Sequence, residues 1–177
     1  MDPAAAQAFV SLYHQALPEV YGYLARRCHD GQLAEDLTSE VFLAAVRAIK
    51  QGDVVTVGVP WLIGVARHKL ADHWRKRARD DRLQDALATE HAETDDPWDA
   101  TLDRVQATEV LCALGDHHRS ALTLRYVDGL PVPEVADLLG RTVHATEALL
   151  VRARNAFRAA YDKGADGLRG RNGDHGA

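Results

Sequence analysis

Cationic and tryptophan side chains are concentrated in residues 61–79. From residue 67 to residue 79 there are six Lys or Arg residues against one acid, Asp72, and tryptophans occupy positions 61 and 74. Cations bind phosphates and indole rings stack on unpaired bases, so this segment suits nucleic acid whose strands are separated. The alternative is a core helix whose charged face meets only solvent and whose tryptophans are core residues.

Residues 132–150 show a second pattern, which is typical of a pair of helices that binds double-stranded DNA. A short apolar helix with the small residue Ala136 on its inner face precedes Gly140, where a turn with positive φ costs little, and a second helix with Leu149 facing back follows. This is the layout of a helix-turn-helix, whose second helix enters the major groove. An ordinary helical hairpin with a solvated arginine face is the alternative. The candidate base and phosphate contacts are Arg141, Thr142, His144, Ala145, Glu147 and Ala148, with Arg152, Arg154 and Arg158 further along the helix.

An acidic cluster contains Glu35, Asp36 and Glu40, the last two of which lie one helical turn apart. Two carboxylates could act as general acid and base, but no nucleophile or glycine-rich phosphate loop accompanies them. A solvated face and a docking face for a basic protein remain open. The cysteines and histidines lack the spacing of a zinc site, so we expect a protein that is not an enzyme and needs no metal or cofactor.

The overall composition is mildly acidic. The 177 residues include 21 Lys and Arg against 26 Asp and Glu, a net charge of −5, which argues against a protein that simply coats nucleic acid. No run of eighteen apolar residues and no secretion signal is present, so we expect no membrane insertion. Two cysteines, Cys28 and Cys112, cannot form a disulfide framework, which favours a reduced, cytoplasmic protein with both thiols packed.

Helical periodicity predicts an all-α protein that presents these groups. In the first half the expected elements are a helix with a bend or new start near Pro18 and a stop near Asp30, a helix over residues 33–48, an extended loop over 54–59 and a helix over 61–79. In the second half, helices are expected over residues 105–114, 116–127, 132–139 and 143–161.

Charge divides the chain into two predicted domains. Residues 80–103 contain nine acids opposed only by Arg82, which is typical of a solvated linker. We therefore expect a domain over residues 1–80, an acidic, flexible linker over 81–103, a domain over 104–163 and a disordered tail over 164–177.

Three ordered segments carry a resemblance to a known family. They read AEDLTSEVFLAAVRAI (residues 34–49), PWLIGVARHKLADHWRKR (residues 60–77) and LRYVDGL (residues 124–130), and the last is followed by the helix-turn-helix pattern. The resemblance covers roughly residues 7–161 in the family's order, and the acidic linker stands where the small group of the family to which it points lacks a third domain. The chain resembles the extracytoplasmic-function (ECF) group of the sigma-70 family of bacterial transcription initiation factors.

The resemblance implies two small helical domains, a sigma region 2 helical bundle and a sigma region 4 helix-turn-helix. Such a factor binds core RNA polymerase, through the β′ clamp helices and the β subunit, and directs initiation at specific promoters. The polymerase-docking residues would be Glu35, Asp36 and Glu40. An anti-sigma factor would be a further partner.

The resemblance also assigns the two DNA surfaces. Residues of the basic helix would open the minus-ten element: Trp61, Arg67, His68, Lys69, Asp72, Arg75, Lys76 and Arg77. Residues of the recognition helix would read the minus-thirty-five element: Arg141, Thr142, His144, Ala145, Glu147, Ala148, Arg152 and Arg154.

This sequence departs from the family pattern at four of the positions that matter. His68 stands where the family usually has Asn, and Pro131 replaces the Ser that commonly caps the first helix of the motif. Glu147 and Leu149 replace a Lys and an Arg of the recognition helix, although Glu147 could accept a hydrogen bond from cytosine N4.

Our interpretation is a sigma factor that opens the minus-ten element and reads the minus-thirty-five element. A stand-alone helix-turn-helix regulator would instead bind duplex DNA without core polymerase. A helical protein-interaction module would bind no DNA at all.

Overall fold

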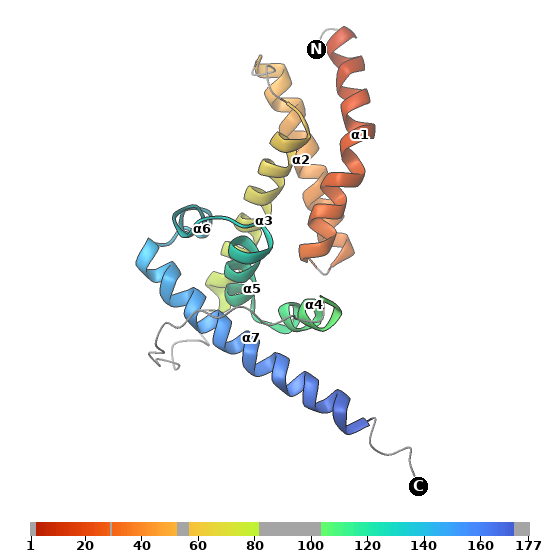
Figure 1. The fold of residues 1–177 in the computed structure, drawn as a ribbon. Coiled ribbons are helices and arrows are strands. Elements are labelled where there is room, and N and C mark those ends of the chain that lie inside the picture. Colours follow the sequence, from red (N-terminus) through yellow and green to blue (C-terminus); the bar gives the residue numbers. More distant parts are fainter. Residues whose placement is uncertain (1–2, 29, 53–56, 82–103, 172–177) are drawn as a thin grey trace. The chain divides into compact units, whose positions relative to one another are not determined.

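The computed structural model describes residues 3–28, 30–52, 57–81 and 104–171, and every regular element in these ranges is a helix. Packing divides the chain into two compact units, residues 1–73 and 74–177, which are described separately. The all-α prediction is confirmed for the described residues (Figure 1).

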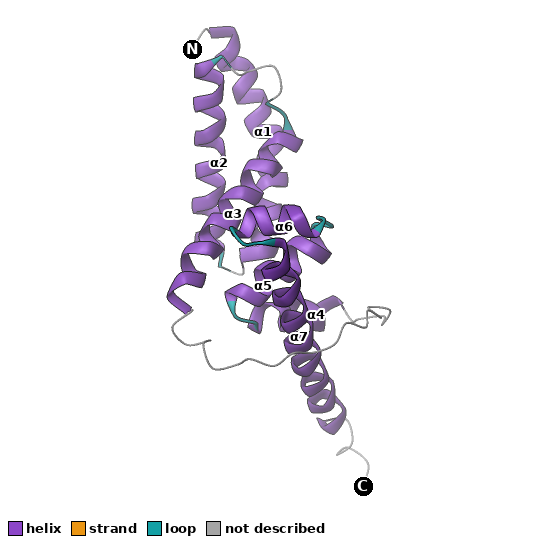
Figure 2. Ribbon diagram, turned by 90° about the vertical axis from the view of Figure 1, so that its left-hand side faces the viewer, coloured by secondary structure: helices purple, strands orange, loops and turns teal. Residues whose placement is uncertain are grey.

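The first unit contains α1 (Pro3–Cys28), α2 (Gly31–Gln51) and the first part of α3 (Val59–Asp81). Helices α1 and α2 lie side by side, as both ribbon views show (Figure 1, Figure 2). The core of the unit is built from side chains at helical spacing, among them Val20, Leu24, Val41, Leu62 and Leu70, all fully buried. Side chains at this spacing form the apolar stripe of an amphipathic helix.

Two polar or small residues fix the ends of α2. Asp30 caps its start, because the Asp30 carboxylate accepts hydrogen bonds from the backbone N–H groups of Gln32 and Leu33 at 3.0 and 3.4 Å. Gly52 ends the helix with φ of 85°, a conformation in which a side chain would be strained. The sequence pattern predicts only that the preceding helix stops near Asp30, but the Asp30 side chain also starts the next one.

Of the two alternatives predicted near Pro18, a bend or a new helix start, the new start is wrong, since α1 runs through this residue without interruption. Proline inside a helix costs about 3 kcal/mol. On either side of the exposed Pro18, however, α1 buries Ala16, Val20 and Leu24 completely. A buried Val or Leu contributes about 1.5–3 kcal/mol, so packing against the core outweighs the lost hydrogen bond.

The second unit holds the end of α3, then α4 (Arg104–Ala113), α5 (Asp116–Leu122), a short π-helix η3 (Thr123–Val127), α6 (Val132–Leu139) and α7 (Val143–Arg171). The helices α4, α5 and α6 each pack against α7. A cluster of Val110, Leu122, Ala153 and Phe157 forms a core at the crossing of α4, α5 and α7.

Helix α7 continues to Arg171, past Tyr161 where the pattern predicted its end. The disordered tail over residues 164–177 stays a prediction, and α7 is assigned through residues 164–171 of it. Once Ala153 and Phe157 anchor the helix, each further residue adds a hydrogen bond at little additional cost. Residues 82–103 of the predicted linker (81–103), residues 54–56 of the predicted loop (54–59) and residues 172–177 of the predicted tail (164–177) lie outside the described residues.

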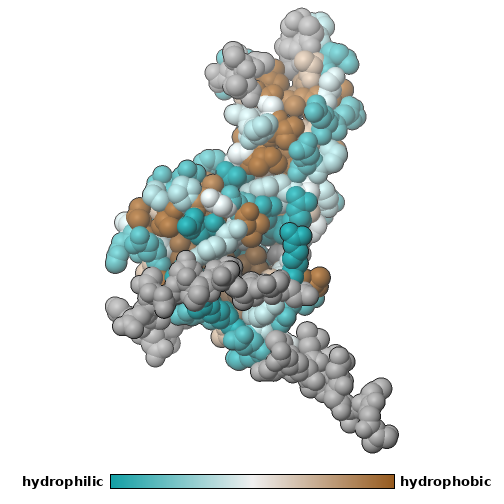
Figure 3. All heavy atoms as spheres, in the orientation of Figure 1, coloured by the Kyte–Doolittle hydropathy of each residue, from teal (hydrophilic) through white to brown (hydrophobic). Residues whose placement is uncertain are grey.

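Within the described ranges, no helix combines the length and the apolar character that crossing a membrane requires. Figure 3 shows hydrophobic residues between the helices of the first unit and hydrophilic residues along their outer flanks.

Candidate nucleic-acid interface

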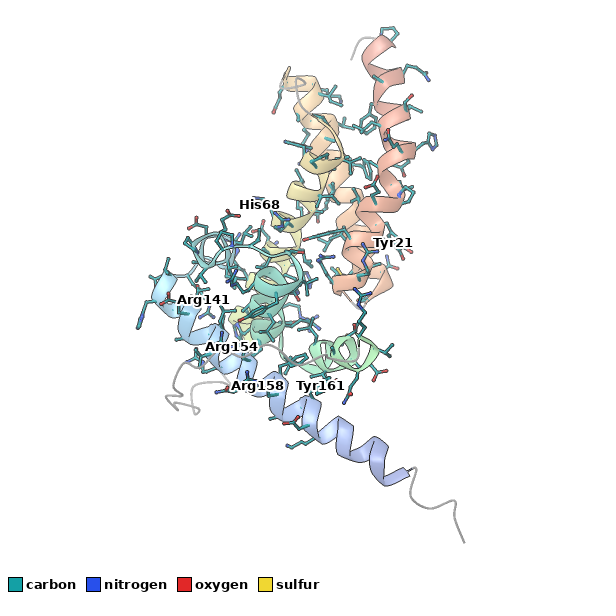
Figure 4. All side chains as sticks on the ribbon, viewed as in Figure 1. Tyr21, His68, Arg141, Arg154, Arg158 and Tyr161 are labelled. Atoms are coloured by element: carbon teal, nitrogen blue, oxygen red, sulfur yellow. The ribbon has the colours of Figure 1, made fainter. Side chains whose placement is uncertain are left out.

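The residues of α3 that were predicted to meet unpaired DNA divide between the two units. Trp61, Arg67, His68, Lys69 and Asp72 belong to the first, whereas Arg75, Lys76 and Arg77 belong to the second. Trp61, His68 and Asp72 follow one another at spacings of seven and four, so they share one face of α3. His68, labelled in Figure 4, is exposed on this face, and Trp61 and Asp72 are half-buried.

Trp74 is a core residue, with 2% of its surface exposed, so it is not available for stacking on a base. Beside it in the second unit, the guanidinium of Arg77 pairs with the carboxylate of Asp116 at 2.7 Å. Asp116 is buried and also pairs with Arg119. Arg77 therefore stabilises this unit through Asp116, a role that the charge pattern alone did not indicate.

The acidic cluster of α2 lies on the surface of the first unit. Glu35, Asp36 and Glu40 are all exposed, and the Glu40 carboxylate pairs with the ammonium of Lys69 at 2.8 Å. Leu43 follows Glu40 by three residues and Asp36 by seven, so it lies on the same face, where 54% of it is exposed. The sequence pattern did not single out Leu43, and we call these four residues the α2 face.

A groove of about 600 Å³ runs between α1 and α2 beside this face. Glu35 and Leu43 line it together with Phe9, Tyr13, Leu17, Tyr21, Thr38, Ser39, Phe42 and Val46. The rings of Tyr13 and Phe42 meet edge to face at 4.7 Å between centroids, which fixes the floor. Apolar side chains of α1 therefore line an open groove as well as the core.

The helix-turn-helix geometry is confirmed in detail. Gly140 has φ of 62°, and the N–H of Arg141 donates to the carbonyl of Ala136 at 2.9 Å, so the chain turns directly after α6. Ala136 and Leu149 are buried, as the crossing of the two helices requires. Thr142 caps α7, because its hydroxyl oxygen accepts from the N–H of Ala145 at 3.1 Å.

The start of α7 presents a narrow exposed face. His144, Glu147, Ala148 and Arg152 are exposed together with the capping Thr142, while Arg141 and Ala145 are half-buried. Asn155, which the sequence pattern did not single out, is exposed and follows Ala148 by seven residues, so it extends the same face. This face is the part of the helix that a major groove could receive.

Arg154 and Leu149 have structural contacts. The guanidinium of Arg154 donates to the phenolic oxygen of Tyr126 at 2.9 Å, which holds it against η3. Figure 4 labels Arg154 and Arg158 on α7 and Arg141 in the turn before it, and Arg158 is exposed. Leu149 stands where the family has an Arg, and its burial beneath α6 makes it a packing residue of the motif.

The prediction of packed thiols is confirmed for Cys28 and only in part for Cys112. Cys28 is buried, and Cys112 is half-buried with its thiol donating to the carbonyl of Thr108 at 2.7 Å. Burial raises the pKa of the Cys112 thiol above its ordinary value of 9.0, although the nearby Arg119 opposes the shift. Among the described residues, no three His, Cys, Asp or Glu side chains gather in a way that could hold a metal ion.

Comparison with known proteins matches both units. Residues 12–80 match the family described as Sigma-70 region 2, and residues 104–157 match Sigma-70, region 4. The chain is 31% identical over 157 residues to the ECF RNA polymerase sigma factor SigM of Bacillus subtilis, covering 86% of this chain and 94% of that protein. It is 34% identical to the ECF RNA polymerase sigma factor BldN of Streptomyces coelicolor, covering 84% of this chain but only 58% of the longer relative.

A similar fold occurs among solved structures. The sigma factor RpoE of Bartonella quintana, solved in complex with the anti-sigma factor NepR, aligns with a TM-score of 0.52 at 20% identity, covering 88% of this chain and 98% of that one. At this identity the likeness concerns the fold.

Proposed function

Because the chain belongs to the extracytoplasmic-function group of the sigma-70 family, we propose that it binds core RNA polymerase and directs initiation at its own set of promoters. The observation that carries this proposal is the presence, in one chain, of region 2 and of a region 4 helix-turn-helix with an exposed recognition face. A stand-alone regulator would need only the second of these, so that alternative is not favoured.

The polymerase would dock on the α2 face. Exposed carboxylates at Glu35, Asp36 and Glu40 attract basic groups of a partner, and Leu43 offers the apolar contact that such an interface buries near its centre. The groove beside it could receive further apolar side chains of the partner. On the family pattern, these would come from the β′ clamp helices, with the β subunit as the second contact.

Two different surfaces would contact the promoter. Separating strands requires stacking partners and cations. Trp61 and His68 would supply the rings to the minus-ten element, and Arg67, Lys69, Arg75, Lys76 and Arg77 the cations. Asp72, on the same face of α3 as His68, would contact the element as a hydrogen-bond acceptor. Reading a duplex requires a helix in a groove, and the exposed start of α7 would supply it at the minus-thirty-five element. Within this second set, Arg154 would act by positioning Tyr126 and η3 as well as through DNA.

Three further points belong to the same proposal. The factor performs no covalent chemistry and uses no cofactor, because lending promoter specificity to the polymerase requires neither. It works in the cytoplasm, where polymerase and promoters are located. An anti-sigma factor would hold it inactive by covering the α2 face or the groove beside it.

The test combines the purified full chain with core polymerase on a library of genomic fragments, and the run-off transcripts are sequenced. We expect transcripts that start downstream of two shared elements and that are missing with core polymerase alone. A chain that binds these fragments equally well without polymerase, and that starts no transcript with it, would be a regulator and not a sigma factor.

A further inference from the structure

Glu147 is the acidic side chain at the centre of the exposed face of α7. It is exposed, it is the fifth residue of the helix, and no hydrogen bond or ion pair joins it to another described residue. The residues one turn away on either side are Val143, His144, Leu150 and Val151, so α7 brings no Lys or Arg next to this carboxylate. If α7 enters a major groove, Glu147 meets the bases with an uncompensated negative charge.

A bare carboxylate in a DNA groove is unfavourable unless the DNA itself compensates it. Phosphates on both sides of the groove repel it, and its own hydration is removed on docking. A contribution to α7 through the helix dipole does not account for this placement, since that effect fades beyond the first turn and Glu147 lies in the second. A hydrogen bond from a base is the compensation that the groove can provide.

The edges of the base pairs limit which base that is. In the major groove only cytosine N4 and adenine N6 donate, while guanine and thymine present acceptors that a carboxylate cannot use. Adenine places its N7 acceptor beside N6, which suits an amide that both donates and accepts. Cytosine offers its amino group without a neighbouring acceptor on the same base, and it therefore suits a group that only accepts.

We propose that Glu147 is a specificity-determining residue that selects a cytosine at one position of the minus-thirty-five element. The inference rests on the proposed function, because it requires α7 to read the promoter duplex. It assigns a role to the position where the family commonly has a lysine. A lysine there would bind phosphate or guanine, so this chain is expected to prefer different promoters from relatives that keep the lysine.

The experiment uses the full chain with core polymerase and a promoter library in which the minus-thirty-five region is randomised. Sequencing of the transcripts gives the preferred base at each position. For the unchanged protein we expect one position with cytosine favoured by roughly 5- to 30-fold, the lower part of the range for a good bidentate contact, because cytosine donates through N4 alone. Glu147→Gln should move the preference at that position alone towards adenine, because an amide matches adenine N6 and N7.

Glu147→Ala should remove the discrimination at the same position and leave the other positions unchanged. Glu109→Gln is the matched control, since Glu109 is also exposed on a helix of this unit but lies on α4, and it should leave every preference unchanged. As a second measurement, a single promoter is changed from C·G to T·A at the selected position. This change should weaken transcription by the unchanged protein and have little effect with Glu147→Ala.

The outcomes distinguish a failure of the proposed function from a failure of the role of Glu147. If the unchanged protein selects no promoter at all, the proposed function fails. If it selects promoters, but Glu147→Gln and Glu147→Ala keep the base preferences of the unchanged protein, then Glu147 does not read a base and this inference is overturned. The inference is equally overturned if the C·G to T·A change weakens transcription to the same extent with and without the Glu147 carboxylate.

Discussion

Replacing Leu43 with alanine tests whether the α2 face docks on the polymerase. Burying a whole leucine side chain contributes about 1.5–3 kcal/mol. Because 54% of Leu43 is exposed, docking can bury about half of it, which amounts to about 0.8–1.6 kcal/mol. Since about 1.4 kcal/mol is a factor of ten in Kd, Leu43→Ala should weaken binding to core polymerase by about 4- to 15-fold.

Titration of labelled full-length protein with core polymerase, followed by fluorescence anisotropy, measures this Kd directly. The control is Val10→Ala on α1, because Val10 is 45% exposed but does not line the groove. Thermal unfolding by circular dichroism checks that both variants are folded, which is expected because alanine is the best helix former.

An unchanged Kd for Leu43→Ala would refute the assignment of Leu43 as an apolar anchor. An equal loss for Val10→Ala would also refute it, because general surface hydrophobicity and not the α2 face would then decide binding. If Leu43→Ala weakens binding but neutralising Glu35 and Asp36 has no effect at low salt, the docking face is apolar only and the proposed role of the acids is wrong.

Three further predictions concern the second unit. Asp116→Ala leaves the half-buried Arg119 without its carboxylate and should cost about 3–5 kcal/mol of unfolding free energy, measured by urea titration. Arg77→Gln changes a side chain that is 62% exposed, so in the same titration it should cost less than about 1 kcal/mol. Gly140→Ala places a side chain at φ of 62° and should lower stability by about 1–2 kcal/mol, measured by calorimetry; a neutral result would mean that the turn relaxes. Burial raises the pKa of the Cys112 thiol, so its reaction with iodoacetamide should reach half-maximum above pH 9.0 in the folded protein and near the ordinary value in urea. Because the folded state favours the neutral thiol, its contribution to stability is present below pH 9.0 and is lost as the pH rises further.

The helix-turn-helix could be predicted because its constraints are local. A small residue at Ala136, a glycine at the turn and a buried leucine at position 149 lie within fourteen residues of each other, and each is confirmed by the structure. The helices of both units could be predicted for the same reason, because buried side chains three and four residues apart are visible in the sequence.

What could not be predicted depends on contacts between distant residues. The path of α1 through Pro18 follows from burial against other helices, which outweighs a strong local signal. The contact of Arg154 with Tyr126 joins residues 28 positions apart, so spacing along α7 alone assigned Arg154 only to DNA. Leu43 lies on the face of Asp36 and Glu40, and periodicity along one helix does not single out an isolated apolar residue on an acidic face.

The ion pair between Lys69 and Glu40 joins the helix proposed for docking to the helix proposed for strand opening. One ammonium cannot neutralise a carboxylate of α2 and a promoter phosphate in full at the same time. A polymerase residue that takes over Glu40 would therefore release Lys69 for DNA, and by reciprocity a phosphate that binds Lys69 would release Glu40 for the polymerase. The affinity of the protein for DNA would therefore rise when polymerase is bound, and its affinity for polymerase would rise when DNA is bound. Because Lys69 then adds a phosphate contact, the salt dependence of DNA binding should be steeper with polymerase bound than without it.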